Sequence, residues 1–335
     1  MAVPVLPLID IAPLLADPDS QASAIVARQI DDACRDLGFF RVVGHGIDPA
    51  LQPALEVASH SFFDRPEGAK AAIAMEHGGR AWRGWFPVGG ELTSGVPDQK
   101  EGIYFGSNHS ANHPRVRSGV PLHGKNLFPA EPADLEPLVE SWIDQVAHVG
   151  LAILRGIARG LELAPQWFDD NLVSDPTVLF RIFHYPPGDD ATWGVGEHTD
   201  YGLLTVLAQD ECGGLQVRLD DDWIDVPPEQ GVFVCNLGDM IERLTEGRYR
   251  STVHRVRNTS GRSRLSFPLF LDPSWDAVVP VMPLAGSPPA DDPARRWDGS
   301  SVRLWEGSYG HYLTTKVARV FPALVASMHD EPAQP

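Results

Sequence analysis

The sequence of 335 residues is poor in cysteine and in basic residues. Its three cysteines, Cys34, Cys212 and Cys235, are far apart and form no CxxC pair, which argues against a disulfide framework and a thiolate zinc site. Lysine and arginine number 27 against 45 acidic residues, and the net charge of −18 disfavours nucleic acid and anionic membranes as partners. A small anion held by one or two local arginines is still compatible with this charge.

Long apolar runs are also missing. No stretch of 18 or more apolar residues occurs, so no membrane span is predicted. The N-terminus lacks a basic segment and reaches Asp10 early, which is not typical of a signal peptide. Together with the few cysteines, this pattern predicts a reduced, cytoplasmic protein.

Glycine and proline are plentiful, with 31 and 30 residues, and they separate short segments along the whole chain. After Pro176, β-prone runs follow one another at spacings of roughly a dozen residues, which is typical of a sandwich or jelly roll. These predicted strands cover 178–185, 202–208, 214–218, 223–226, 231–236, 253–257 and 264–270.

Helical periodicity lies mainly outside this region. Apolar residues at helical spacing predict helices over 21–37 and 135–163, a short one over 165–172 and a final one near 309–321. We therefore expect an α+β, β-rich fold with a single catalytic domain. Its expected parts are an N-terminal wrapping region (1–110), helical support (111–176), a jelly-roll core (177–275) and a C-terminal loop and helix (276–335).

A candidate metal site lies in the core. In a strand, His198 and Asp200 would point to the same face, because side chains alternate. His254, in a later predicted strand, offers a third ligand. Two histidines and one carboxylate on one face of an octahedron form the arrangement of non-haem Fe(II) oxygenases. A lone His-x-Asp pair is expected by chance in a chain of this composition, so the triad needs further support.

That support comes from Arg264 and Ser266, which share a strand face ten residues after His254. A buried arginine is costly unless an anion neutralises it, and its fork suits a carboxylate. A dicarboxylate with a 2-keto acid at its other end, such as 2-oxoglutarate, could bridge metal and arginine. The alternative is that Arg264 pairs with an internal acid such as Asp239 or Asp272.

At these residues the sequence resembles the isopenicillin N synthase-like family of Fe(II)/2-oxoglutarate-dependent oxygenases. The resemblance covers nearly the whole chain. Its motifs, in matching order and spacing, are Leu6–Ile11, Gly38–Ile47, His184–Pro187, Gly196–Thr205, Gly213–Val217, Asn236–Asp239, Gly247–Val256 and Arg264–Phe267.

The resemblance implies a distorted double-stranded β-helix, or jelly roll, with helices packed on it and an N-terminal region typical of non-haem dioxygenases. It implies that His198, Asp200 and His254 bind Fe(II), and that Arg264, Ser266 and Tyr185 bind the distal carboxylate of 2-oxoglutarate. Phe183 stands where plant members commonly have asparagine, so we expect a cosubstrate pocket that differs in detail.

The implied activity couples O2-dependent decarboxylation of 2-oxoglutarate, to succinate and CO2, with C–H oxidation of a small organic substrate. Hydroxylation, desaturation and cyclisation all fall within this chemistry. Two alternatives remain open. One is an iron-dependent oxidase or cyclase of the same fold that does not use 2-oxoglutarate; the other is a non-catalytic jelly-roll binding module.

The substrate pocket is harder to predict. In relatives the segment before the core contributes to it, and here that segment offers Arg83, Trp85, Tyr104 and Phe105. An aromatic pocket with an arginine would suit a small acid or a natural-product precursor; the alternative is that the aromatic residues belong to the core. The stretches 86–97 and 283–297 are candidates for a lid.

Overall fold

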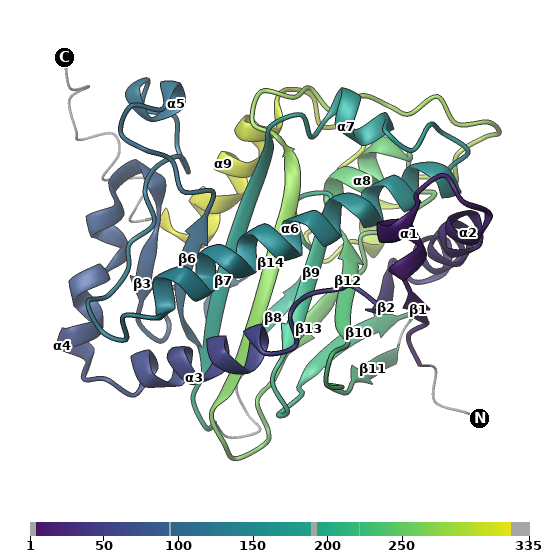
Figure 1. Ribbon diagram of the computed structural model, residues 1–335. Helices are drawn as coiled ribbons and strands as arrows, with labels where there is room; N and C mark the ends of the chain where they lie inside the picture. Colours follow the sequence, from purple (N-terminus) through teal and green to yellow (C-terminus); the bar gives the residue numbers. More distant parts are fainter. Residues whose placement is uncertain (1–4, 94, 189–192, 221, 323–335) are drawn as a thin grey trace.

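Two β-sheets form the core of the computed structural model, which describes residues 5–93, 95–188, 193–220 and 222–322 (Figure 1). The large sheet has the spatial order β1 (Leu8–Asp10), β2 (Phe39–Val43), β12 (Phe233–Leu237), β9 (Leu204–Gln209), β14 (Arg264–Ser274), β7 (Pro176–Tyr185), β6 (Glu101–Gly106) and β3 (Gly84–Phe86). The small sheet has the order β11 (Asp222–Val226), β10 (Leu215–Leu219), β13 (His254–Val256) and β8 (Val195–His198). The short pair β4 (Leu92–Thr93) and β5 (Val96–Pro97) lies near β8.

The N-terminal part of the chain supplies strands to both edges of the large sheet. Strands β1 and β2 extend one edge, where β2 pairs antiparallel with β12. Strands β6 and β3 extend the other edge, where β6 pairs antiparallel with β7. The first third of the chain therefore flanks the strands of the C-terminal half on both sides.

Helices cover one face of the large sheet (Figure 1). Helix α6 crosses β7, β14 and β9, and its buried Trp142 contacts the rings of Phe180, Phe233 and Phe267. Helices α2 and α3 pack beside α6, and α2 begins after Ser20, whose hydroxyl caps the Ser23 amide. The α-helices are α1 (Ala12–Ala16), α2 (Gln21–Asp36), α3 (Leu51–Phe63), α4 (Glu67–Lys70), α5 (Pro114–Arg117), α6 (Leu135–Gly160), α7 (Trp167–Asn171), α8 (Asp239–Leu244) and α9 (Tyr309–Val320).

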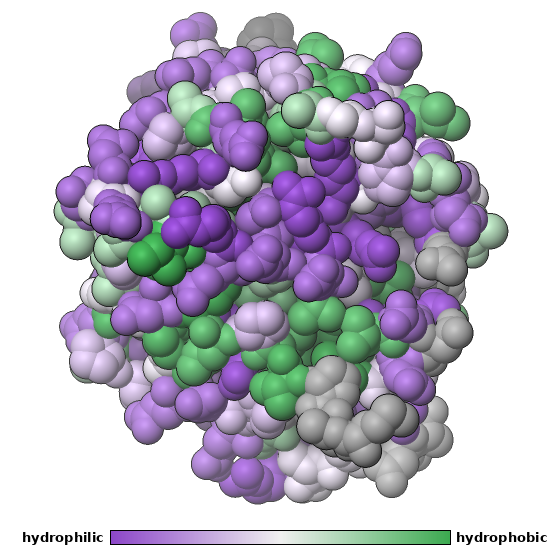
Figure 2. All heavy atoms as spheres, turned by 90° about the vertical axis from the view of Figure 1, so that its right-hand side faces the viewer, coloured by the Kyte–Doolittle hydropathy of each residue, from purple (hydrophilic) through white to green (hydrophobic). Residues whose placement is uncertain are grey.

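Three short 3₁₀ segments, Ala71–Ile73, Met75–Ala81 and Pro293–Arg295, complete the described secondary structure. Hydrophilic residues cover most of the face that lies on the right in Figure 1, with hydrophobic residues gathered in its lower half (Figure 2). No described helix combines the length and the apolar character that a membrane span requires.

The predicted β-rich α+β fold is confirmed, and the helices predicted over 21–37, 135–163 and 309–321 lie within a few residues of α2, α6 and α9. One local expectation was wrong. Strand β8 ends at His198, so Asp200 lies beyond the strand and does not share a strand face with it. The path of the loop that follows β8, rather than strand alternation, brings the side chains of His198 and Asp200 together.

Candidate metal centre and its cavity

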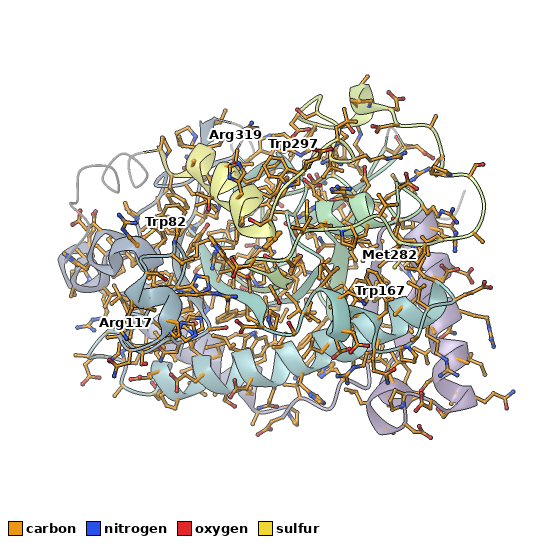
Figure 3. All side chains as sticks on the ribbon, turned by 90° about the horizontal axis from the view of Figure 1, so that it is seen from above. Trp82, Arg117, Trp167, Met282, Trp297 and Arg319 are labelled. Atoms are coloured by element: carbon orange, nitrogen blue, oxygen red, sulfur yellow. The ribbon has the colours of Figure 1, made fainter. Side chains whose placement is uncertain are left out.

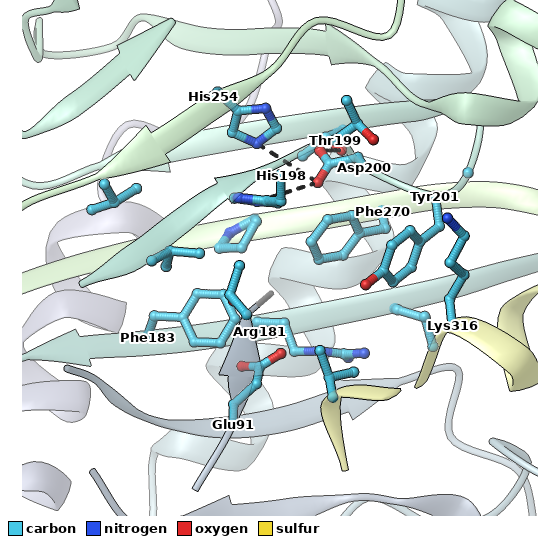
Figure 4. Close-up of a pocket in the computed structure, with 18 of the residues that line it drawn as sticks. Glu91, Arg181, Phe183, His198, Thr199, Asp200, Tyr201, His254, Phe270 and Lys316 are labelled. Carbon is cyan, nitrogen blue, oxygen red and sulfur yellow. Dashed lines mark hydrogen bonds and ion pairs between the residues drawn. The ribbon is translucent and has the colours of Figure 1, made fainter. Parts of the chain in front are cut away.

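Three side chains meet at the end of the small sheet. His198 ends β8 and His254 begins β13, and the two residues are direct cross-strand partners. Asp200 follows two residues after His198, and one ligand atom from each of the three side chains lies within 4.8 Å of the others. Nε2 of His198 and Nε2 of His254 lie 3.9 and 3.7 Å from Oδ1 of Asp200 (Figure 4).

Backbone contacts fix both imidazoles in one orientation. Nδ1 of His198 lies 2.8 Å from the Gly196 carbonyl, and Nδ1 of His254 lies 3.1 Å from the Thr252 carbonyl. A carbonyl can only accept a hydrogen bond, so each Nδ1 carries a proton, and in the neutral imidazole each Nε2 then keeps a lone pair. Burial lowers the pKa of His254, and the neighbouring His198 lowers it further. Neutral imidazoles with converging Nε2 atoms are what a metal ion requires.

The carboxylate of Asp200 is held from its other side. Its Oδ2 accepts hydrogen bonds from Oγ1 of Thr205 at 2.5 Å and from Nδ2 of Asn236 at 2.6 Å, which leaves Oδ1 facing the histidines. Burial opposes ionisation of Asp200, but the two imidazoles and these hydrogen bonds hold its pKa below the ordinary value. Such contacts behind a ligand orient it toward a metal.

A distant segment supports the same loop. The indole nitrogen of Trp297 donates to Oγ1 of Thr199, between His198 and Asp200, at 2.9 Å. Its neighbour Arg296 forms a buried ion pair with Asp239 of α8 at 2.7 Å, and the Asp239 amide donates to the Asp200 carbonyl. Figure 3 shows Trp297 beside α9 and Arg319. Trp297 and Arg296 of the C-terminal segment thus hold the loop that carries His198 and Asp200.

A buried arginine lies at another part of the cavity. Arg264 is fully buried; its Nε donates to the Gly213 carbonyl and its Nη2 to Oε1 of Gln209 at 3.2 Å. Its Nη1 is buried and has no hydrogen-bond partner among the described residues. Across the strand pair, the Tyr185 ring lies 4.6 Å from the guanidinium carbon, and the Tyr185 hydroxyl lies 3.4 Å from that of Ser266.

The alternative that Arg264 forms an ion pair with an internal acid, Asp239 or Asp272, is not supported. Asp239 pairs with Arg296, and Oδ2 of Asp272 accepts from the Tyr309 hydroxyl. Within the described ranges, no carboxylate lies within ion-pair distance of Arg264. Its free Nη1 is therefore open to a ligand from the cavity.

One cavity of about 410 Å³ joins the metal-site residues to Arg264 and extends beyond them. Alternate residues of β7 and β14 line it, because each strand turns every second side chain inward. From β7 these are Leu179, Arg181, Phe183 and Tyr185; from β14 they are Arg264, Ser266, Pro268, Phe270 and Asp272. Helix α9 and the Glu91–Thr93 region add further wall, so both predicted lid stretches reach the cavity through Glu91 and Trp297.

The four predicted substrate residues are placed differently from one another. Tyr104 lines the cavity, whereas Arg83, Trp85 and Phe105 are not among its lining residues. Arg83 is buried and donates from Nη2 to the Leu122 carbonyl. The Trp85 indole donates to a carboxylate oxygen of Glu101, and Phe105 packs among other phenylalanine rings.

Several cavity residues were not predicted. Arg181 lies in a predicted strand, four positions before Tyr185, so period-two alternation would have placed it on the same inward face. Phe183 lies between them, and Nζ of Lys100 is 4.8 Å from its ring centre, so a lysine approaches the position where plant members have asparagine. Glu91 comes from a loop with no such periodic signal.

Comparison with known proteins gives the family. Residues 176–273 match the 2OG-Fe(II) oxygenase superfamily, and residues 6–131 match the N-terminal region of non-haem dioxygenases in morphine synthesis. A probable iron/ascorbate oxidoreductase of Dictyostelium discoideum is 42% identical, with 95% of each chain covered. The chain belongs to the 2OG-Fe(II) oxygenase superfamily.

Two further proteins are similar to this chain over more than nine tenths of its length. A homoarginine-6-hydroxylase of Arabidopsis thaliana is 35% identical, covering 96% of this chain and 90% of its own. The crystal structure of a full-length Neurospora crassa protein in complex with alpha-KG and thymine superposes with a TM-score of 0.76 at 27% identity, over 93% of this chain and 96% of its own.

The predicted family, enzyme class and cofactors are thereby confirmed. The chain is an Fe(II)/2-oxoglutarate-dependent dioxygenase, an oxidoreductase that uses O2. A structural relative binds the small molecule thymine together with alpha-KG, which is consistent with a small-molecule substrate.

Proposed function

We propose that His198, Asp200 and His254 hold the catalytic Fe(II) of this oxygenase. The observation that carries this proposal is the convergence of two lone-pair Nε2 atoms and one Oδ1 within 4.8 Å. Two nitrogens and one carboxylate oxygen form the facial set of non-haem iron oxygenases and leave other positions open for ligands.

We further propose that Arg264, Ser266 and Tyr185 receive the distal carboxylate of 2-oxoglutarate. The buried, unpartnered Nη1 of Arg264 supports this assignment, because a carboxylate would supply the missing hydrogen-bond acceptor. The hydroxyls of Ser266 and Tyr185 lie close enough together to donate to the same anion. These three residues, called the cosubstrate clamp below, would hold one end of 2-oxoglutarate. They would thereby set the direction in which its keto acid points.

When bound, iron and 2-oxoglutarate supply the O2-dependent oxidation of a substrate C–H bond. The protein contributes orientation and exclusion of water. Thr205 and Asn236 hold the Asp200 carboxylate, and the largely apolar wall around Phe183 and Phe270 keeps bulk solvent from the reacting atoms. A cavity of about 410 Å³ suits a small molecule beside the cosubstrate. We propose that Tyr104 contacts this substrate.

Hydroxylation, desaturation and ring closure all remain outcomes of this chemistry. The absence of nucleic-acid and membrane partners and the cytoplasmic location remain predictions that rest on the net charge of −18 and on the three separated cysteines.

One experiment tests the ligand assignments and separates them from the two alternatives. Fe(II) and then 2-oxoglutarate are added anaerobically, the metal-to-ligand charge-transfer band is recorded, and succinate is measured after O2 is admitted. We expect both the band and succinate. Iron binding without the band would favour an oxidase that does not use 2-oxoglutarate, and failure to bind iron would favour a binding module.

A further inference from the structure

A second buried arginine lies on the cavity wall. Arg181 occupies the same inward face of β7 as Tyr185, four residues away, which corresponds to about 13 Å at roughly 3.3 Å per residue. Tyr185 is the cross-strand partner of Arg264. Figure 4 shows Arg181 across the cavity from His198, Asp200 and His254. The cavity therefore has two buried arginines, Arg181 in the middle of β7 and Arg264 on β14 beside the end of β7.

The guanidinium of Arg181 is rigidly placed. Arg181 is 5% exposed, and its Nη1 donates to the carbonyls of Phe105 and Phe180 at 3.0 and 3.1 Å. Its guanidinium carbon lies 3.5 Å from the centre of the Tyr104 ring, in a cation–π contact. These contacts orient the group but do not neutralise its charge.

The acids that face Arg181, Glu91 and Asp272, stabilise its charge at longer range, and each has a closer hydrogen-bond partner. Glu91 forms an ion pair with Lys100 at 2.9 Å and accepts from the Tyr104 hydroxyl at 2.5 Å. Asp272 accepts from the Tyr309 hydroxyl. Within residues 5–93, 95–188, 193–220 and 222–322, no carboxylate lies within 4.0 Å of the Arg181 guanidinium.

An arginine held in this way favours an incoming anion. Burial lowers the pKa of Arg181, but a guanidinium stays charged at neutral pH. A buried charge without a partner is unfavourable, so an anion that reaches it gains both the ion pair and charge-assisted hydrogen bonds. The planar fork of the group is complementary to a carboxylate.

The surroundings of Arg181 define the rest of the ligand. Besides charged side chains such as Glu91 and Lys316, the neighbouring wall has apolar and aromatic side chains of β7, β14 and α9, namely Leu179, Phe183, Phe270, Leu313, Val317 and Phe321. The apolar part of this wall stabilises an apolar body but offers few polar partners. The ligand that fits is an organic acid whose carboxylate reaches Arg181 and whose apolar body extends toward the metal side.

We propose that Arg181 binds a carboxylate of the substrate, and that the substrates are small carboxylic acids with an apolar body. This inference rests on the proposed function, because it assigns Arg264 to the cosubstrate and leaves Arg181 for the substrate. Arg181 then determines substrate specificity: it fixes one end of the acid and so selects which C–H bond lies beside the metal.

The test uses full-length enzyme with Fe(II) and saturating 2-oxoglutarate under anaerobic conditions. Hexanoate, 3-phenylpropionate and 4-phenylbutyrate are each compared with their primary amide by isothermal titration calorimetry. We expect at least one acid to bind about tenfold to a hundredfold more tightly than its amide, as a charge-assisted hydrogen-bonded pair predicts. In Arg181→Gln this preference should disappear, and in Arg181→Lys it should be reduced.

Arg83→Gln is the matched control, because Arg83 is also a buried arginine but does not line the cavity. It should keep the preference for the acid. The proposal is overturned if no acid binds better than its amide to the wild type, if Arg181→Gln keeps the preference, or if only Arg83→Gln loses it. If Arg181→Gln fails to fold, Arg181→Lys replaces it. A preference for the acid over the amide that is unchanged in Arg181→Lys then also overturns the proposal. The charge-transfer band of the same wild-type sample reports separately on the proposed function.

Discussion

The two ends of the cavity differ in how their residues are brought together. At the metal end, His198 and Asp200 are two residues apart, and His254 is the cross-strand neighbour of His198. At the Arg181 end, the wall combines β7 with Tyr104 of β6, Glu91 from a loop and Val317 of α9, segments that lie far apart in the sequence. A two-residue spacing and one strand pairing therefore define the first end, whereas the packing of four separate segments defines the second.

This difference separates the proposed metal chemistry from the proposed choice of substrate. The metal end needs a fixed set of atoms, which short motifs can encode. The Arg181 end needs an apolar wall that fits the substrate and one positive charge, and many combinations of segments can provide both. Variants at the two ends should therefore fail in different ways, and the following predictions probe that distinction.

The largest effect is expected at the carboxylate of the metal end. Asp200→Ala removes one of the three proposed ligands and should abolish measurable Fe(II) binding and succinate formation, a loss of at least about 100-fold. Equilibrium dialysis with Fe(II) measures it. Asp225→Ala, in an exposed part of β11, is the control. Wild-type iron affinity in Asp200→Ala would exclude Asp200 as a ligand.

A smaller loss is expected at the cosubstrate clamp. Arg264→Gln should raise the KM for 2-oxoglutarate by about tenfold to a hundredfold, because it removes charge-assisted hydrogen bonds in a buried site. Titration of the charge-transfer band gives the corresponding Kd. Arg262→Gln, two residues earlier and paired with Glu211 on the surface, should leave the KM unchanged. Equal KM values for both variants would disprove the clamp.

The hydrogen bond behind the metal ligand should matter less. Thr205→Val keeps the shape of the side chain but removes the donor to Oδ2 of Asp200, and Fe(II) affinity should fall about tenfold. Thr245→Val removes another buried hydroxyl, which contacts the Ile241 carbonyl in α8. This control should lower thermal stability but not Fe(II) affinity. If both variants bind iron equally well, the contact does not orient Asp200.

The smallest effect is expected at the C-terminal segment. Trp297→Phe removes the indole donor to Thr199 and should lower the free energy of unfolding by about 1 kcal/mol, measured by urea denaturation. In Trp305→Phe the lost indole nitrogen has no hydrogen-bond partner among the described residues, so that change should cost less. A larger loss in Trp305→Phe would contradict the role given to the Trp297 hydrogen bond.

Much of the fold could be predicted because periodicity is a local property. The apolar stripe of α6 and the strand runs after Pro176 lie within a few residues of their predicted bounds. Strands β3 and β6 were missed: β6 pairs with β7, more than 70 residues away, and β3 joins the large sheet only through β6. The pairing of a strand to the edge of a sheet produces no local pattern that a single sequence would reveal.

The same limit applies to the candidate site. The triad and Arg264 could be selected from spacing and residue type, although the shared strand face assumed for His198 and Asp200 was wrong. Arg83 was selected as the arginine of the substrate pocket from its place in an aromatic segment, but Arg181 lines the cavity instead. Alternation along β7 was the available signal.

The most direct test measures both ligands in two variants of the same enzyme. The Kd of 2-oxoglutarate, from the anaerobic charge-transfer band, and the acid-over-amide preference, from calorimetry, are determined for Arg264→Gln and Arg181→Gln. We predict that Arg264→Gln weakens 2-oxoglutarate while Arg181→Gln abolishes the acid preference, each with little effect on the other ligand. If both variants weaken 2-oxoglutarate equally and neither changes the acid preference, the cavity does not have two separate carboxylate sites.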